Sequence, residues 1–236
     1  MYNYVTDKQL ISSMRSLSGN MMQDLCHILK EKYDIGAMFT LVGSGARNLI
    51  LQNANEPIDL DYNLKIIRID DYEDCPYIKE CVRKAFNIVL RKYGWEDCED
   101  SKSSLTTKKH HLPGNKTLFS IDVCIVCEDE DGNLYRLIHK KTGNTNVNNI
   151  AYAASIYPRL VTRRLVNEYY WNMAPNSRNI KFKIDYIKSN GKWELVREQY
   201  KNIKNRYLTQ NDYNHPSFIC YIEAVNNAYN SRKHWK

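Results

Sequence analysis

Two carboxylates separated by a single residue, Asp59 and Asp61, are the side chains of this sequence best suited to chemistry. From Ile58 to Ile66 apolar and polar residues alternate, which is the period of a half-buried β-strand. Residues i and i+2 of a strand share a face, so we expect the two Cα atoms to lie roughly 6.5–7 Å apart and the charges to repel. A cation between them would turn this repulsion into coordination, and carboxylate oxygens suit Mg²⁺.

A third carboxylate, Asp122, lies on the polar side of another alternating segment, residues 118–126. If the two strands are neighbours in one sheet, the three Asp side chains can converge. Three carboxylates that bind two divalent cations are the arrangement used for in-line phosphoryl or nucleotidyl transfer. Upstream, Gly43 and Ser44 form a turn before a short helix, where backbone N–H groups and a hydroxyl can contact phosphate oxygens.

Periodicity and turn signals outline the elements that must position these residues. Helices are expected over residues 8–32, 46–52, 75–93, 148–173, 180–189, 192–208 and 217–230, and strands over residues 37–42, 58–66, 118–126 and 134–139. This order predicts an α+β chain, in which a mixed sheet with flanking helices (residues 1–146) precedes a helical C-terminal domain (residues 147–236).

The bulk composition places the chain among soluble globular proteins. Its 236 residues are 43% hydrophobic and 26% charged, which argues against wholesale disorder. The sequence lacks an apolar run of 18 residues and a secretory leader, so we expect no membrane partner. Seven scattered cysteines fit a reducing compartment and predict a cytoplasmic protein. The net charge of +7 slightly favours polyanionic partners such as nucleotides or RNA.

The motifs also carry a family resemblance. Leu41-Val42-Gly43-Ser44 followed by Ile58-Asp59-Leu60-Asp61 resembles the signature of the DNA polymerase β-like nucleotidyltransferases, in particular the small bacterial members. Ile121-Asp122-Val123 resembles the strand that carries their third metal-binding carboxylate. The resemblance covers roughly residues 35–127. The spacer between Ser44 and Asp59, which contains Pro57, is at the long end of the family's range.

The resemblance implies a polymerase β-like palm and the transfer of a nucleoside monophosphate from an NTP to an acceptor hydroxyl, with release of pyrophosphate. It implies that Asp59, Asp61 and Asp122 bind two Mg²⁺ ions, with Mn²⁺ as an alternative, and that Gly43 and Ser44 hold the triphosphate of the NTP donor. The acceptor stays open among RNA, a second nucleotide, a small molecule and a protein. The basic charge slightly favours a nucleic acid or nucleotide.

Four further groups of residues have both a functional and a structural interpretation. Arg163, together with Arg159 and Arg164, could bind a triphosphate or an RNA backbone, although a solvated helix face explains these residues equally well. The cluster Tyr169-Tyr170-Trp171 could stack on a base but is better explained as core. The segment 108–111 is better explained as a solvated loop than as a phosphate contact. Cys124 and Cys127 are expected to be buried and inert, because residues three apart on a strand cannot share a metal.

A second function class remains open at this stage. The chain could be a catalytically silent polymerase β-like module that binds nucleotides and acts as a regulatory or toxin–antitoxin partner. Three mutually repelling carboxylates argue against this alternative, because a silent module has no physical reason to keep them. The sequence does not separate a housekeeping enzyme from a resistance or defence enzyme with the same chemistry.

Overall fold

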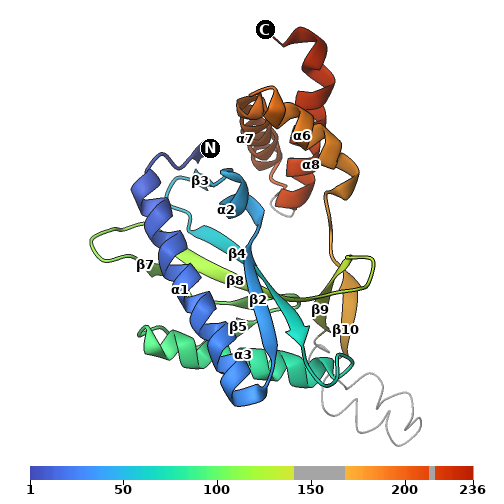
Figure 1. The fold of residues 1–236 in the computed structure, drawn as a ribbon. Helices are drawn as coiled ribbons and strands as arrows, with labels where there is room; N and C mark the ends of the chain where they lie inside the picture. The colour runs from blue at the N-terminus through green and yellow to red at the C-terminus, as the bar shows by residue number, and fades with distance from the viewer. Residues whose placement is uncertain (141–167, 213–215, 236) are drawn as a thin grey trace, which may run out of the picture.

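The computed structural model describes residues 1–140, 168–212 and 216–235. Its centre is a sheet with the strand order β10-β9-β8-β4-β2 (Figure 1). The strands on this path are β2 (Gly36–Leu41), β4 (Ile58–Arg68), β8 (Leu118–Glu128), β9 (Leu134–Lys140) and β10 (Glu168–Met173). The two long central strands, β4 and β8, are parallel, and the other neighbours on the path are antiparallel.

Shorter strands complete the β-structure of the described residues. Three of them extend the main sheet, namely β5 (Glu99–Asp100), β6 (Leu105–Thr106) and β7 (His110–His111). The other two, β1 (Tyr2–Tyr4) and β3 (Leu51–Asn53), form a separate antiparallel pair. Because β6 pairs with β8, it brings an additional side chain next to Asp122.

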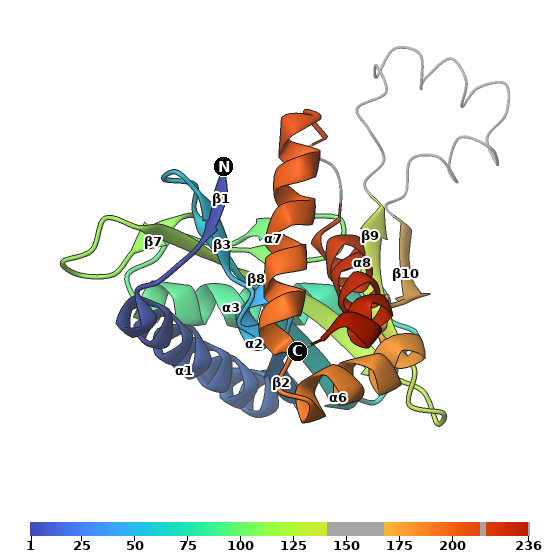
Figure 2. The same ribbon diagram turned by 90° about the horizontal axis from the view of Figure 1, so that it is seen from above.

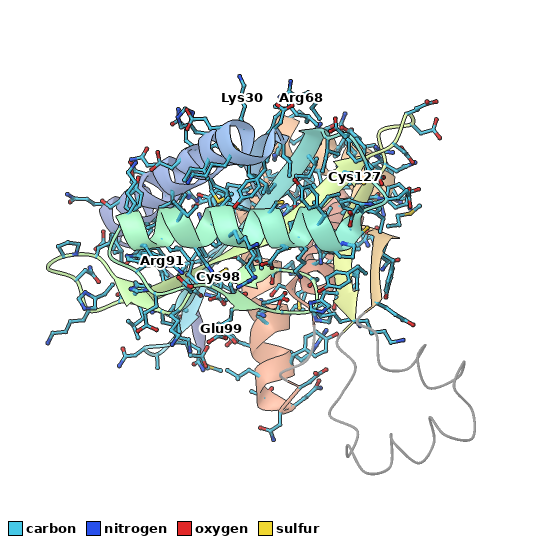
Figure 3. All side chains as sticks on the ribbon, turned by 90° about the horizontal axis from the view of Figure 1, so that it is seen from below. Lys30, Arg68, Arg91, Cys98, Glu99 and Cys127 are labelled. Atoms are coloured by element: carbon cyan, nitrogen blue, oxygen red, sulfur yellow. The ribbon has the colours of Figure 1, made fainter. Side chains whose placement is uncertain are left out.

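One face of the sheet packs against α1 (Lys8–Tyr33) and α3 (Cys75–Lys92), which lie side by side in Figure 3. As expected for an N-cap, the Asp7 side chain accepts a hydrogen bond from Leu10 N at 2.9 Å. The apolar residues of β4 and β8 point toward these helices and form the larger core, with Leu60, Leu64 and Ile121 fully buried. The alternation noted in the sequence therefore turns the polar residues of both strands to the opposite face.

A second, smaller core lies in the helical region above the sheet (Figures 1 and 2). Its elements are η1 (Arg178–Ile180), α6 (Lys181–Ser189), α7 (Trp193–Thr209), α8 (Ser217–Asn230) and η2 (Ser231–His234). Leu49 from the first part of the chain is buried in this core. The proposed boundary between residues 146 and 147 lies outside the described residues, and β10, from the second range, is a strand of the main sheet.

Two of the predicted helices need correction. The helix expected over residues 46–52 is instead α2 (Gly43–Arg47), followed by strand β3. Asn48 has a left-handed backbone (φ 59°) that ends α2, and the next residues pair with β1. The helix expected over residues 148–173 is wrong for residues 168–173, which form β10 along the edge of β9. The aromatic residues of this segment suit a strand, and pairing with β9 outweighs the helical periodicity.

Candidate active site

The parallel pairing of β4 and β8 brings the predicted carboxylates together. Asp61 is directly opposite Asp122, and Asp59 is opposite Ser120, two residues earlier on both strands. Neighbouring strands lie about 4.8 Å apart, so the three carboxylates occupy one small area of the polar face. Asp59 is exposed, and Asp61 and Asp122 are half-buried, so the area is open to a ligand.

Two hydroxyl groups orient two of these carboxylates. Ser120 Oγ donates a hydrogen bond to Asp59 Oδ1 at 2.5 Å, and Thr106 Oγ1 donates to Asp122 Oδ1. Thr106 reaches this position because it is paired with Asp122 across β6 and β8. Sequence reasoning missed both residues. The position of Ser120 two residues before Asp122 would have been a signal, whereas the two-residue strand of Thr106 has no periodicity to detect.

Asp61 lies in the least favourable environment of the three for a negative charge. Burial raises its pKa to about 6, and the negative charges of Asp122 and Asp59 add to this effect. The positive charges of Arg136 and Arg47 oppose the rise without cancelling it. Burial also raises the pKa of Asp122, against the hydrogen bond from Thr106. Both carboxylates therefore lack sufficient positive charge nearby.

The donor set suits a hard divalent cation. Asp59, Asp61 and Asp122 offer only oxygen ligands, which is the preference of Mg²⁺ and Mn²⁺. Hydrogen bonds from Ser120 and Thr106 orient two of these carboxylates, as is common for metal-binding carboxylates. In the described part of the chain, no three acidic, histidine or cysteine side chains already converge at metal-ligand distances. A bound cation would offset the repulsion between these carboxylates.

The Gly43-Ser44 turn lies directly against Asp61. The backbone N–H of Val42 donates to the Asp61 carbonyl oxygen at 2.8 Å, and α2 begins at the next residue. Gly43 has a φ of +63°, and a Cβ atom at this position would lie 2.3 Å from Asp61 Oδ2. A side chain at position 43 is therefore excluded by both the backbone and the carboxylate. Ser44 follows in the first turn of α2 and is half-buried.

Arg47 connects this turn to the helical region. Its Nη1 donates to the Gly43 carbonyl oxygen at 2.9 Å, and its guanidinium lies 4.6 Å from the ring centroid of Tyr221 in α8. Arg15 of α1 donates from Nη2 to the Gly45 carbonyl oxygen. The turn is thus fixed by arginines from two elements, and the helical region contacts it from the other side.

The outcome differs among the remaining candidate residues. Arg163, with Arg159 and Arg164, lies outside the described residues. The aromatic cluster is split by its strand: the Tyr169 ring stacks on His139 at 4.2 Å and Trp171 Nε1 donates to the Tyr72 carbonyl, whereas Tyr170 is exposed.

In the segment 108–111, Lys108 pairs with Glu96 at 2.6 Å, and His110 stacks on Trp95 at 3.9 Å. These contacts hold part of the predicted loop against the sheet. Cys124 and Cys127 are part-exposed rather than buried. Burial raises the pKa of both thiols, that of Cys127 to about 11, which keeps them protonated and unreactive.

Three solved structures show the fold to which this arrangement belongs. CdnC of E. coli MS115-1, in a structure with ATP, has a TM-score of 0.56 at 15% identity. The match covers 97% of this chain and 62% of the CdnC chain. The di-nucleotide cyclase DncV of Vibrio cholerae, in complex with ATP and GTP, has a TM-score of 0.55 at 12% identity. The match covers 95% of this chain and 69% of the DncV chain. The GTP-bound form of DncV has a TM-score of 0.51 at 14% identity, and the match covers 95% of this chain and 57% of the DncV chain.

The chain spans about three fifths of the length of the CdnC structure. The sequence matches no family model and no curated protein. Within the described residues, no helix has the length and apolar content needed to cross a membrane. At these identities the structural likeness establishes the architecture alone: the chain has the fold of the polymerase β-like nucleotidyltransferases, with a mixed palm sheet followed by a helical region.

Proposed function

We propose that this protein is a metal-dependent nucleotidyltransferase that moves a nucleoside monophosphate from an NTP to an acceptor hydroxyl and releases pyrophosphate. The observation that carries the proposal is the pairing of Asp61 opposite Asp122 on parallel strands, with Asp59 beside them and Gly43 against Asp61. Asp59, Asp61 and Asp122 would hold the two Mg²⁺ ions. When bound, the ions would neutralise the triphosphate and acidify the acceptor hydroxyl.

The chain's own residues then supply binding and orientation. Gly43 and Ser44 are the proposed contacts of the donor triphosphate, through backbone N–H groups and the Ser44 hydroxyl. Ser120 and Thr106 fix one oxygen of Asp59 and one of Asp122, which leaves the second oxygen of each carboxylate free to bind a cation. Arg47 holds the Gly43 carbonyl and so keeps the turn in place beside Asp61.

A second nucleotide is the acceptor that we favour. The structures with the same fold include a di-nucleotide cyclase in complex with ATP and GTP, which supports an acceptor of this kind. The excess of basic residues in the C-terminal part of the chain also favours a polyanionic substrate. Residues 1–140 contain 18 Lys and Arg against 21 Asp and Glu, whereas residues 168–236 contain 12 against 6.

Pyrophosphate release tests the proposal. The purified protein is incubated with each NTP and each pair of NTPs in Mg²⁺, in Mn²⁺ and in EDTA, and products are separated by ion-exchange chromatography. We expect pyrophosphate and a linked nucleotide product with at least one pair, and neither in EDTA. A double variant, Asp59→Ala with Asp61→Ala, is the matched inactive control.

A silent binding module gives a different result. It would bind NTPs in equilibrium titrations and release no pyrophosphate with any nucleotide pair, RNA or small hydroxyl acceptor. That outcome would overturn the proposed activity.

A further inference from the structure

Arg136 shares the polar face of the sheet with the three carboxylates. It lies in β9 directly opposite Val126 of β8, and Val126 follows Asp122 by four residues. Residues an even number apart on a strand share a face, as do directly opposed residues on neighbouring strands. Its positive charge is close enough to lower the pKa of Asp61 and of Cys124 against the effect of burial. Arg136 therefore faces the candidate site from β9.

The Arg136 guanidinium has unmet hydrogen-bonding capacity. Its Nε is buried without an acceptor, and within the described residues the side chain forms neither a hydrogen bond nor an ion pair. Two lysines on the same face differ in this respect: Lys65 pairs with Glu128 at 2.6 Å, and Lys140 pairs with Glu168 at 3.1 Å. A buried donor without an acceptor is unfavourable, and an anionic ligand would remove this cost.

Arg136 and the Gly43-Ser44 turn, the proposed contact of the donor triphosphate, lie on opposite sides of β4 and β8 in the sheet. The Gly43-Ser44 turn follows β2, on one flank of β4, whereas Arg136 lies on β9, beyond β8 on the other flank. In an in-line transfer the attacking and leaving oxygens lie on opposite sides of the reacting phosphorus. If the donor triphosphate occupies the Gly43 flank, the acceptor approaches from the flank of Arg136.

We propose that Arg136 binds a phosphate group of the acceptor, and that the acceptor is therefore a nucleotide. This inference rests on the proposed function. A guanidinium forms paired hydrogen bonds with phosphate oxygens, which a carboxylate-lined site otherwise repels. Asn172, directly opposite Arg136 in β10, and Tyr170, two residues before it, are exposed on the same face. These two side chains leave a polar and an aromatic surface for the rest of the nucleotide.

Calorimetric titration tests the phosphate contact without turnover. The donor site of the full chain is saturated with a non-hydrolysable ATP analogue in Mg²⁺, and AMP, adenosine, GMP and guanosine are then titrated separately. For at least one base we expect the monophosphate to bind about 10- to 100-fold more tightly than its nucleoside, the range of a charge-assisted hydrogen bond. Arg136→Gln should remove this preference, and Arg136→Lys should retain part of it.

Lys140→Gln is the matched control, because it removes a cation from the same face of the same strand that already has a partner. It should keep the full preference. An unchanged preference in Arg136→Gln, or no preference in the wild type, would overturn the role of Arg136. The proposed function would still stand if the analogue binds and pyrophosphate is released. A wild type that neither binds the analogue nor releases pyrophosphate would refute the proposed function, and the inference with it.

Discussion

Two buried or half-buried groups of charged residues on opposite faces of the same sheet differ in how the negative charge of their carboxylates is balanced. On the face covered by α3, Asp100 lies between Lys79 Nζ and His139 Nδ1, each 2.8 Å from one of its carboxylate oxygens. Burial raises the pKa of Asp100, but its hydrogen bonds and the charges of Lys79 and His139 outweigh burial, so its pKa lies below the ordinary value. On the other face, Asp61 has its pKa raised to about 6 by burial, Asp122 and Asp59.

The comparison separates a carboxylate with protein partners from the one that we propose binds a cation. The partners of Asp100 come from the protein itself, since Lys79 is only 5% exposed and His139 only 6% exposed at the side chain. Within the described residues Asp61 has no comparable partner, and its neighbours on β4 and β8 add negative charge. Removing one partner from a cluster of the first kind leaves a buried charge unpaired, whereas removing one carboxylate from a cluster of the second kind relieves repulsion in the absence of a cation.

The largest expected effect is on activity at the unbalanced cluster. Asp61→Asn should lower kcat for pyrophosphate release by about 10³-fold, because a cation ligand and its charge are lost together. In metal-free buffer its free energy of unfolding should stay the same or rise, since a repelling charge is removed. Kinetics and urea unfolding of the same preparation check both parts. Asp185→Asn, an exposed carboxylate in α6, is the control, and a large loss of stability in Asp61→Asn would contradict the comparison.

The balanced cluster should show the reverse. Asp100→Asn leaves the buried Lys79 ammonium without its charge partner and should lower the free energy of unfolding by about 2–4 kcal/mol. Activity per folded molecule should change less than about threefold, because Asp100 lies on the other face of the sheet. Urea unfolding and active-site titration measure the two quantities. Asp97→Asn, which breaks the exposed pair with Arg91, should cost much less stability than Asp100→Asn, because solvent screens this pair.

The contact between Gly43 and Asp61 gives an intermediate effect. Gly43→Ala places a Cβ atom against Asp61 Oδ2 and should lower the free energy of unfolding by about 2 kcal/mol and kcat by about tenfold or more. Gly94→Ala is a matched control, because Gly94 has a similar φ of +73° and open space around its Cβ position. The difference between the two variants measures the contact alone. Equal losses in stability with unchanged kcat would show that Asp61 adjusts freely.

The smallest expected effect is a difference in pH dependence. In EDTA, the raised pKa of Asp61 means that the folded state binds its proton more tightly than the unfolded state. Its contribution to stability is therefore full below the unfolded pKa and is lost as pH rises through about 6. The wild type should gain about 1–2 kcal/mol relative to Asp61→Asn when the pH falls from 7 to 5. Urea unfolding at both pH values measures this difference, and parallel curves would contradict it.

The pH dependence of Asp100 should have the opposite sign. Its lowered pKa means that it stabilises the protein above the unfolded pKa and loses this contribution only as pH falls through the folded pKa. The stability advantage that the Asp100 carboxylate gives the wild type over Asp100→Asn should therefore be lost only at acid pH, as Asp100 takes up its proton, and urea unfolding at acid pH measures this loss.

Strictly local patterns allowed much of the fold to be predicted. The alternation from Ile58 to Ile66 predicted β4, and the three- and four-residue spacing of apolar residues predicted α1, α3 and α8. Residues 168–173 and 46–52 could not be assigned in this way. Strand β10 in the first segment forms by pairing with β9, and strand β3 at the end of the second forms by pairing with β1. Both partners are distant in the sequence, so a local pattern does not reveal the pairing.

The sequence by itself determined the three carboxylates, the glycine-containing turn before them and the alternation that gives β4 and β8 one polar face. These features depend on residue type and a period of two, both of which are local. Only the tertiary structure decided which residues complete the cluster. Thr106 and Ser120 reach the carboxylates, and Arg136 reaches their face of the sheet, through strand register. The register of β8 against β4 and β6 depends on contacts between segments that are separated in the sequence, whereas the short loop between Glu128 and Leu134 fixes the register of β9.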